Sequence, residues 1–127
     1  EQEFTFGGGK DYVGTADGFA VYPEFRYVLS AGVQGDNWTT ALSIRGIGES
    51  DDVWRHPAVT QDATAEATTY IDAVSSYNFR KSTFRFGINN LTDKNPPYFH
   101  SNFNGNTEPG VYDVIGRRVF VSIVSTF

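Results

Sequence analysis

The sequence predicts an all-β chain, and three features of its 127 residues favour that fold class. Strand-forming residues dominate the apolar set, which has 11 Phe, 7 Tyr and many Val but Leu only at Leu29, Leu42 and Leu91. Apolar and polar residues alternate with a period of two along several segments. The 13 Gly suit a chain with many turns. We therefore expect an antiparallel meander of about six strands.

The alternation places the expected strands in order along the chain. Tight turns at Gln34-Gly35-Asp36 and Arg80-Lys81 join two pairs of strands. The other connections span about 12, 20 and 25 residues, well above the usual ~4–6. One end of the sheet should therefore carry tight turns and the other long loops. The six expected strands are Gln2–Phe6, Phe19–Val33, Asn37–Gly48, Thr69–Phe79, Ser82–Leu91 and Arg117–Phe127.

The same alternation predicts a sheet with one apolar and one polar face. Every charge in the middle of an expected strand falls on the polar phase, where we expect ion pairs such as Arg85 with Asp72. Aromatic residues gather on the apolar phase beside the tight turns or at the chain end, as in the aromatic girdle of an outer-membrane barrel. The charged set is Glu24, Arg26, Arg45, Asp72 and Arg85. The aromatic set is Trp38, Tyr77, Phe79, Phe84 and Phe127.

Two segments in the last third of the chain carry recognisable motifs. Phe84–Tyr98 contains the run GINNLTDKNPP, and Tyr112–Arg118 reads YDVIGRR before a strand that ends at Phe127. Both resemble the C-terminal barrel portion of TonB-dependent outer-membrane receptors, the first through the pattern GxxNLxDxxPP. The segment Tyr22–Arg26, which opens a strand with a proline and an arginine, is similar to that family's P-x-x-R strand start.

The resemblance implies that residues 1–127 are the C-terminal part of an outer-membrane β-barrel domain, with the plug domain outside this chain. The six strands would be the last of a 22-stranded barrel in the outer membrane of a Gram-negative bacterium. Implied partners are the remaining barrel and plug (in the same or another chain), outer-membrane lipid, the TonB complex acting indirectly, and a small-molecule or oligosaccharide ligand. The implied function is import of a nutrient such as a siderophore or an oligosaccharide.

Composition and motifs argue against several other functions. The chain has 10 Lys+Arg against 15 Asp+Glu, a net charge of −5, which disfavours nucleic-acid binding. The absence of Cys excludes disulfides and thiolate chemistry. Neither G-x-S-x-G nor H-E-x-x-H occurs, and the two histidines, His56 and His100, fall on different loops. We expect no catalysis, no cofactor and no metal site.

The expected ligand contacts lie on two of the long loops. Exposed aromatic rings beside amide and charged side chains can stack on a sugar ring or an aromatic chelator and hydrogen-bond its polar edge. The candidates are Trp54, Arg55, His56, Tyr98, Phe99, His100, Asn102, Phe103 and Asn104.

Two other functions stay open from the sequence. A soluble β-sandwich that binds carbohydrate or another partner would show the same alternation of apolar and polar residues. A porin-like passive channel built from several copies of the chain is the third reading.

Overall fold

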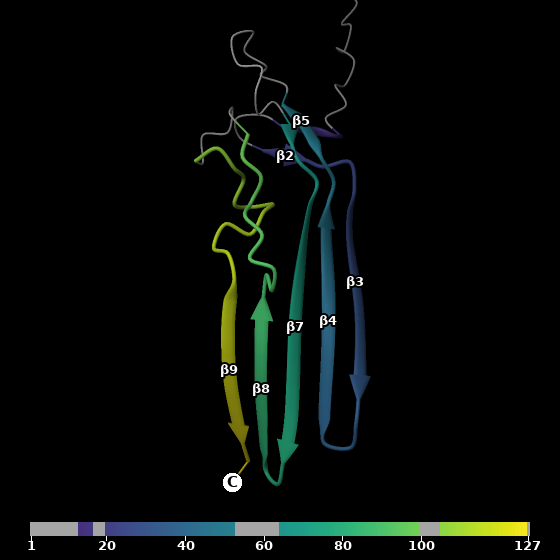
Figure 1. Cartoon of the computed structure of the whole chain (residues 1–127), viewed down its shortest axis with the longest axis vertical. Helices are drawn as coiled ribbons and strands as arrows, with labels where there is room; N and C mark the ends of the chain where they lie inside the picture. Colours follow the sequence, from purple (N-terminus) through teal and green to yellow (C-terminus); the bar gives the residue numbers. More distant parts are fainter. Residues whose placement is uncertain (1–12, 17–19, 53–63, 100–104, 127) are drawn as a thin grey trace, which may run out of the picture.

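Five long strands form one antiparallel up-and-down sheet in the computed structural model, which describes residues 13–16, 20–52, 64–99 and 105–126 (Figure 1). Each overlaps a predicted strand. The sixth predicted strand, Gln2–Phe6, lies outside the described residues. In spatial order the five are β3 (Arg26–Gln34), β4 (Trp38–Ile47), β7 (Thr68–Phe79), β8 (Ser82–Asn89) and β9 (Arg118–Ser125).

Tight turns and long connections lie at opposite ends of this sheet, as predicted. Between β3 and β4 the Gly35 N–H donates to the carbonyl of Trp38 over 2.8 Å. The β7–β8 turn contains Arg80, which has a positive φ of 53° and places its guanidinium carbon 5.2 Å from the centroid of the Phe79 ring. The two long connections leave from the other end, away from the C-terminus (Figure 1).

A second, smaller sheet corrects the predicted strand count, because the described residues form nine strands in two sheets rather than one six-stranded meander. Pro23 has no backbone N–H to donate and separates β2 from β3 in the segment predicted as one strand. The other short strands lie in connections predicted as loops, and two or three residues are too few to show a period. The second sheet runs in the order β2 (Val21–Tyr22), β1 (Thr15–Ala16), β5 (Ser50–Asp52) and β6 (Thr64–Ala65), with β1 and β5 parallel.

The buried core lies at the long-loop end of the molecule. There, residues of the second sheet and of the segment after β8 pack against the ends of β4 and β7. Tyr70 and Phe99 are the largest fully buried side chains among the residues that the structure describes. The cluster consists of Ala16, Val21, Ile47, Ala65, Tyr70, Phe99 and Tyr112.

The five-stranded sheet has the two faces that the alternation predicts. Its register pairs Leu29 with Ile44 and Ile44 with Ile71, so apolar residues lie in cross-strand rows on one face. Every charged residue within these five strands lies on the opposite, polar face. The set is Arg26, Arg45, Asp72, Arg85 and Arg118.

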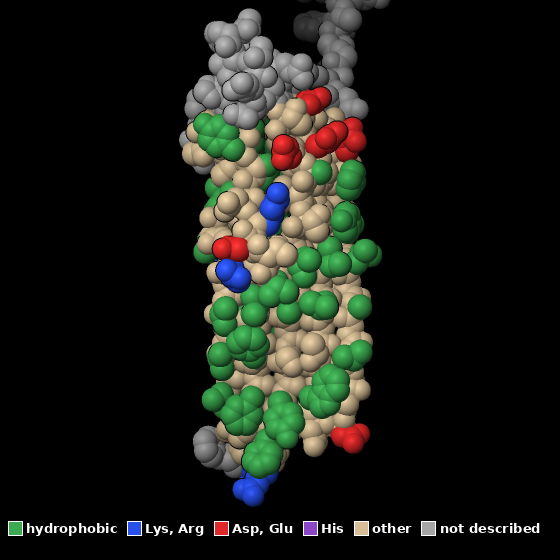
Figure 2. Space-filling view, in the orientation of Figure 1, with side chains coloured by type: hydrophobic (Ala, Val, Ile, Leu, Met, Phe, Trp, Pro, Cys, Tyr) green, Lys and Arg blue, Asp and Glu red, His purple; other side chains and the backbone are tan. Residues whose placement is uncertain are grey.

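The apolar face is exposed over the height of the sheet. Twelve of its large hydrophobic side chains are 39–69% exposed, whereas Ile44, Ile71 and Ile88 are half-buried. Figure 2 shows hydrophobic groups across the strands; most charged groups lie toward the two ends, and an acidic and a basic group lie together partway along the left edge. Trp38, Tyr77 and Phe84 form one cross-strand row near the tight turns, with Phe79 beyond it; Phe127 lies outside the described residues. The exposed set is Tyr27, Leu29, Val33, Trp38, Leu42, Tyr77, Phe79, Phe84, Phe86, Val119, Val121 and Ile123.

Substitutions at two adjacent aromatic residues, Tyr98 and Phe99, test the position of the core. Phe99 is fully buried, whereas Tyr98 is 56% exposed. We expect Phe99→Ala to lower the free energy of unfolding by about 3–5 kcal/mol because it leaves a cavity. Tyr98→Ala should change it by less than about 0.5 kcal/mol. Denaturant titration of both variants measures the difference, and equal losses would contradict this placement of the core.

Candidate functional site on the polar face

A turn closed by Asn90 begins the segment that follows β8. The Asn90 side chain is fully buried, its Nδ2 donates to the carbonyl of Lys94 over 2.9 Å, and its Oδ1 accepts from the Lys94 N–H over 2.8 Å. Asn90 has a positive φ of 53°, a conformation that asparagine adopts more readily than most residues. The Asn-Leu-Thr-Asp-Lys part of the sequence motif therefore builds a defined turn at the end of β8.

Asp72 connects three parts of the fold. Its Oδ2 accepts from Arg45 Nε over 2.7 Å, and its Oδ1 accepts from Arg45 Nη2 over 3.3 Å. The same Oδ1 accepts the Asn90 N–H over 2.9 Å. The Arg45 guanidinium carbon also lies 5.3 Å from the centroid of the Tyr70 ring. One carboxylate thus joins β4, β7 and the Asn90 turn.

Asp93 from the first sequence motif and Arg117 from the second connect at the start of β9. Asp93 Oδ1 accepts the Arg117 N–H over 2.9 Å, and Asp93 Oδ2 lies 3.5 Å from Arg117 Nη2. Gly116 has a positive φ of 79°, and a Cβ at that position would lie 3.1 Å from Asp93 Oδ1. Glycine is therefore the residue that fits both the backbone conformation and the space. The two motifs quoted from the sequence meet in these contacts.

Asp113 ties the loop before β9 to the polar face. Its backbone N–H donates to Tyr70 Oη over 3.2 Å, and its Oδ2 pairs with Arg118 Nη2 over 2.9 Å. Its Oδ1 accepts the Ile115 N–H over 3.3 Å. The Asp113 side chain is only 6% exposed, so this ion pair is largely shielded from solvent on the carboxylate side.

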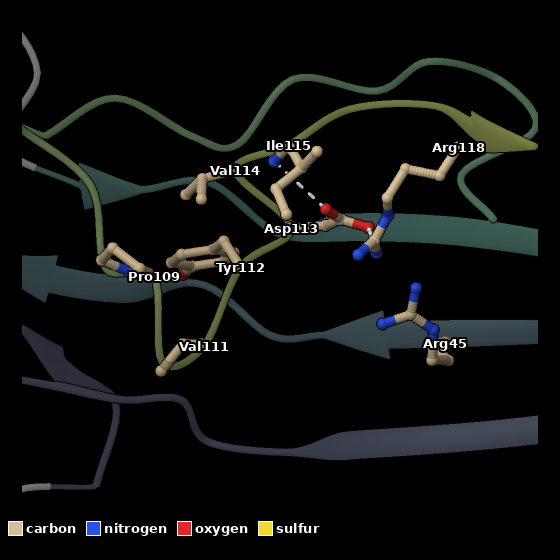
Figure 3. Close-up of a pocket in the computed structure, with 8 residues that line it drawn as sticks. All are labelled: Arg45, Pro109, Val111, Tyr112, Asp113, Val114, Ile115 and Arg118. Atoms are coloured by element: carbon tan, nitrogen blue, oxygen red, sulfur yellow. Dashed lines mark hydrogen bonds and ion pairs between the residues drawn. The ribbon is translucent and has the colours of Figure 1, made fainter.

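A pocket of about 270 Å³ opens between this loop and the sheet. Figure 3 shows the Arg45 guanidinium facing the Asp113–Arg118 pair across it. Pro109, Val111, Tyr112, Val114 and Ile115 supply the remaining lining. Because both arginines already bind carboxylates, the local charge is balanced, and the arrangement serves chiefly to fasten the loop to the sheet.

Among the described residues outside the strands, Tyr112 is the titratable group whose pKa is shifted most. Burial raises the pKa of its phenol from 10.0 to about 12, the nearby Tyr70 adds to the rise, and Arg26 opposes it. Its side chain is 3% exposed, and its hydroxyl has no hydrogen-bond partner among the described residues. The neutral phenol is thus strongly favoured in the folded chain.

The residues predicted from the sequence to contact ligand fall mostly outside the described part. Tyr98 is exposed as expected, but Phe99 packs into the core and does not offer its ring to solvent. The structure therefore separates the two neighbours by burial. Those outside the described residues are Trp54, Arg55, His56, His100, Asn102, Phe103 and Asn104. Within the described part, no three His, Asp or Glu side chains gather to hold a metal ion.

The ion pairs that hold the polar face differ from the predicted one. Asp72 pairs with Arg45 rather than Arg85. The register explains this, because Arg45 lies opposite Tyr70, two residues from Asp72, whereas Arg85 lies opposite Ser76, four residues away. The alternation identified the face correctly, but only the register of β4 on β7 identifies the partner. The alternation of apolar and polar residues could not predict the Asp113–Arg118 pair.

A double-mutant cycle measures the link made by Asp72. We expect Arg45→Gln and Asp72→Asn to show a coupling free energy of about 1–2 kcal/mol, because the pair is partly buried and shares two hydrogen bonds. The exposed Asp93–Arg117 pair is the control, and Asp93→Asn with Arg117→Gln should couple by about 0.5 kcal/mol or less. Equal coupling in both cycles would show that Arg45 is not specially placed.

The buried phenol predicts a pH effect on stability. The Tyr112 pKa is raised in the folded chain, so its contribution is complete below pH 10.0 and is lost as the pH rises toward about 12. The loss should reach about 2–3 kcal/mol, since one pKa unit corresponds to about 1.4 kcal/mol. Tyr112→Phe should lack this component at alkaline pH and be no less stable at pH 7. Unfolding titrations between pH 8 and 12 compare the two proteins, and parallel curves would contradict the assignment.

No known protein was found that resembles this chain. Comparison with protein-family models, curated protein sequences and solved structures found no match to this chain. Within the part of the chain that the structure describes, no helix has the length and apolar character needed to cross a membrane.

Proposed function

We propose that this chain forms part of the wall of a TonB-dependent outer-membrane receptor that imports a nutrient such as a siderophore or an oligosaccharide. In this proposal the five-stranded sheet crosses the outer membrane of a Gram-negative bacterium. The polar face lines the lumen and contacts the plug, and the long connections lie on the extracellular side. The chain contributes barrel wall and ligand-contacting loops, and no catalysis.

The exposed apolar face is the observation that carries the proposal. None of its residues within the five strands is charged, and twelve of its large side chains are 39–69% exposed. Large contiguous apolar patches exposed to water are rare in soluble monomers, where the largest patch covers about 300–600 Å². Exposing such a face to lipid hydrocarbon costs little free energy. A sheet in contact with lipid must also carry its charged side chains on the opposite face.

The height of this face fits a bilayer. On β7 the apolar phase runs from Thr69 to Phe79, and ten residue steps at about 3.4 Å cover about 34 Å along the strand. A tilt of about 40° reduces this to about 26 Å along the membrane normal, close to the ~25 Å apolar band of outer-membrane barrels. The row of Trp38, Tyr77 and Phe84 near the tight turns would then lie at the periplasmic interface.

The two open edges of the five-stranded sheet are consistent with pairing to further strands. β3 and β9 are the edges of the five-stranded sheet, and each pairs with one strand among the described residues. Unpaired backbone groups are costly in hydrocarbon, so both edges need further strands to cross a bilayer. The remainder of the receptor barrel, in the same or another chain, would supply them.

Two neighbouring threonines test which face meets lipid. Thr40 lies on the apolar face between Val33 and Ser75, and Thr39 lies on the polar face between Gln34 and Ser76. Thr40→Arg should destabilise the folded protein by about 2–4 kcal/mol near the middle of the bilayer, and Thr39→Arg by much less. Both variants are introduced into the native gene, and folded protein is quantified in isolated outer membranes.

A control separates charge from the lost hydroxyl. Thr40 Oγ1 and Ser75 Oγ share a hydrogen bond of 2.9 Å, so Thr40→Val removes that bond without adding charge, and it should be tolerated. Equal accumulation of the Thr39→Arg and Thr40→Arg variants would contradict the proposal that the apolar face contacts lipid. A native protein that stays folded and monomeric in buffer without detergent would instead favour a soluble β-sandwich module.

A further inference from the structure

A hollow of about 430 Å³ lies on the polar face of the five-stranded sheet, apart from the pocket under the loop. The floor of this trough lies along one cross-strand row of glycine, alanine and valine residues. Gly32 pairs with Ala41, Ala41 with Val74, and Val74 with Gly87. None of these four residues has a polar side chain, and the row lies between the row that contains Asp72 and the row that contains Arg85.

An aromatic ring closes the β9 end of this trough. Phe120 pairs with Gly87, and its ring lies directly over that glycine, so that a Cβ on Gly87 would collide with the ring. Phe120 is 39% exposed and lines the hollow. The floor and this end therefore offer C–H and aromatic surface, which suits the apolar face of a sugar ring.

Hydroxyl, amide and carboxylate groups form the side of the trough toward the long loops. Ser30 Oγ and Ser43 Oγ lie 3.0 Å apart, and Ser43 pairs across the sheet with Asp72. Asn89 adds an amide from β8 to the same rim. These groups can both donate to and accept from the hydroxyls of a ligand.

Arg85 forms the opposite side and makes this end of the trough cationic. Arg45 and Arg118, the neighbouring arginines of the sheet, pair with Asp72 and Asp113. Arg85 lines the hollow and has no ion pair with any residue that the structure describes. Its guanidinium is therefore available for a carboxylate, which it can bind through two parallel hydrogen bonds.

We propose that this trough binds a sugar acid, a ring with several hydroxyl groups and one carboxylate. The carboxylate binds Arg85, the hydroxyls bind the rim of Ser30, Ser43, Asp72 and Asn89, and the ring lies on the floor against Phe120. The volume falls within the ~300–1,000 Å³ of small-molecule sites. The trough belongs to the polar face whatever medium covers the apolar face, so this inference extends beyond the import function and does not depend on it.

Calorimetry on the purified protein in detergent tests the proposal with galacturonate and its neutral counterpart galactose. We expect saturable binding of galacturonate at least ten-fold tighter than that of galactose. Trigalacturonate is the third probe, because a free sugar acid and a uronate within a polysaccharide present the same chemistry. Tighter binding of the trimer points to the polymer, and equal binding points to the free acid; either supports the site.

Matched variants show whether the trough is the site. Arg85→Gln should abolish the preference for the acid, whereas Arg80→Gln, on the tight turn, should leave it unchanged. Ala41→Leu fills the floor and should abolish binding, whereas Ala31→Leu, on the opposite face, should not. Lack of saturable galacturonate binding, or binding that survives both Arg85→Gln and Ala41→Leu, would overturn the proposal.

The outcome separates from that of the proposed import function. If the protein does not bind sugar acids, the Thr39 and Thr40 variants still test the import function through their accumulation in the outer membrane. Conversely, a chain that proves to be a soluble module still presents the trough, and the same calorimetric comparison applies in buffer without detergent.

Discussion

The cross-strand register of the five-stranded sheet is the constraint on which the rest of the structure depends. Since side chains alternate between faces with a period of two, one register places all five strand charges on the polar face and none on the other. A slip by one residue in any strand would move an arginine or Asp72 onto the apolar face. The tight turns at Gly35 and at Arg80-Lys81 keep the strands in this register.

The distribution of burial follows from that constraint. The apolar face is exposed, so the side chains buried within the protein gather instead at the long-loop end, around Tyr70, Phe99 and Tyr112. Asp72 and Asp113 fasten the segment after β8 to the same end through Arg45, the Asn90 turn and Arg118. The polar face thus has two parts, a region covered by the loop and an open trough nearer the tight turns.

These two parts differ in their charge and in what covers them. The covered region is charge-balanced, and Asp93 and Arg117 connect it to the start of β9. The open trough combines apolar floor residues, the Phe120 ring and Arg85, whose charge no described carboxylate neutralises. In the function proposed above, the trough would face the lumen of the barrel and the opposite face would contact lipid.

The sequence by itself determined the all-β class, five of the long strands, the position of the tight turns and the two-faced sheet, because period-two alternation is a local signal. It did not show that Pro23 divides a strand or that short strands pair in a second sheet, since two or three residues carry no period. Only the tertiary structure decided that Phe99 is buried while Tyr98 is exposed. It also decided that Asp72 binds Arg45 and that glycine, alanine and valine residues from four strands align along the floor of a trough, because such contacts depend on the register between strands far apart in the chain.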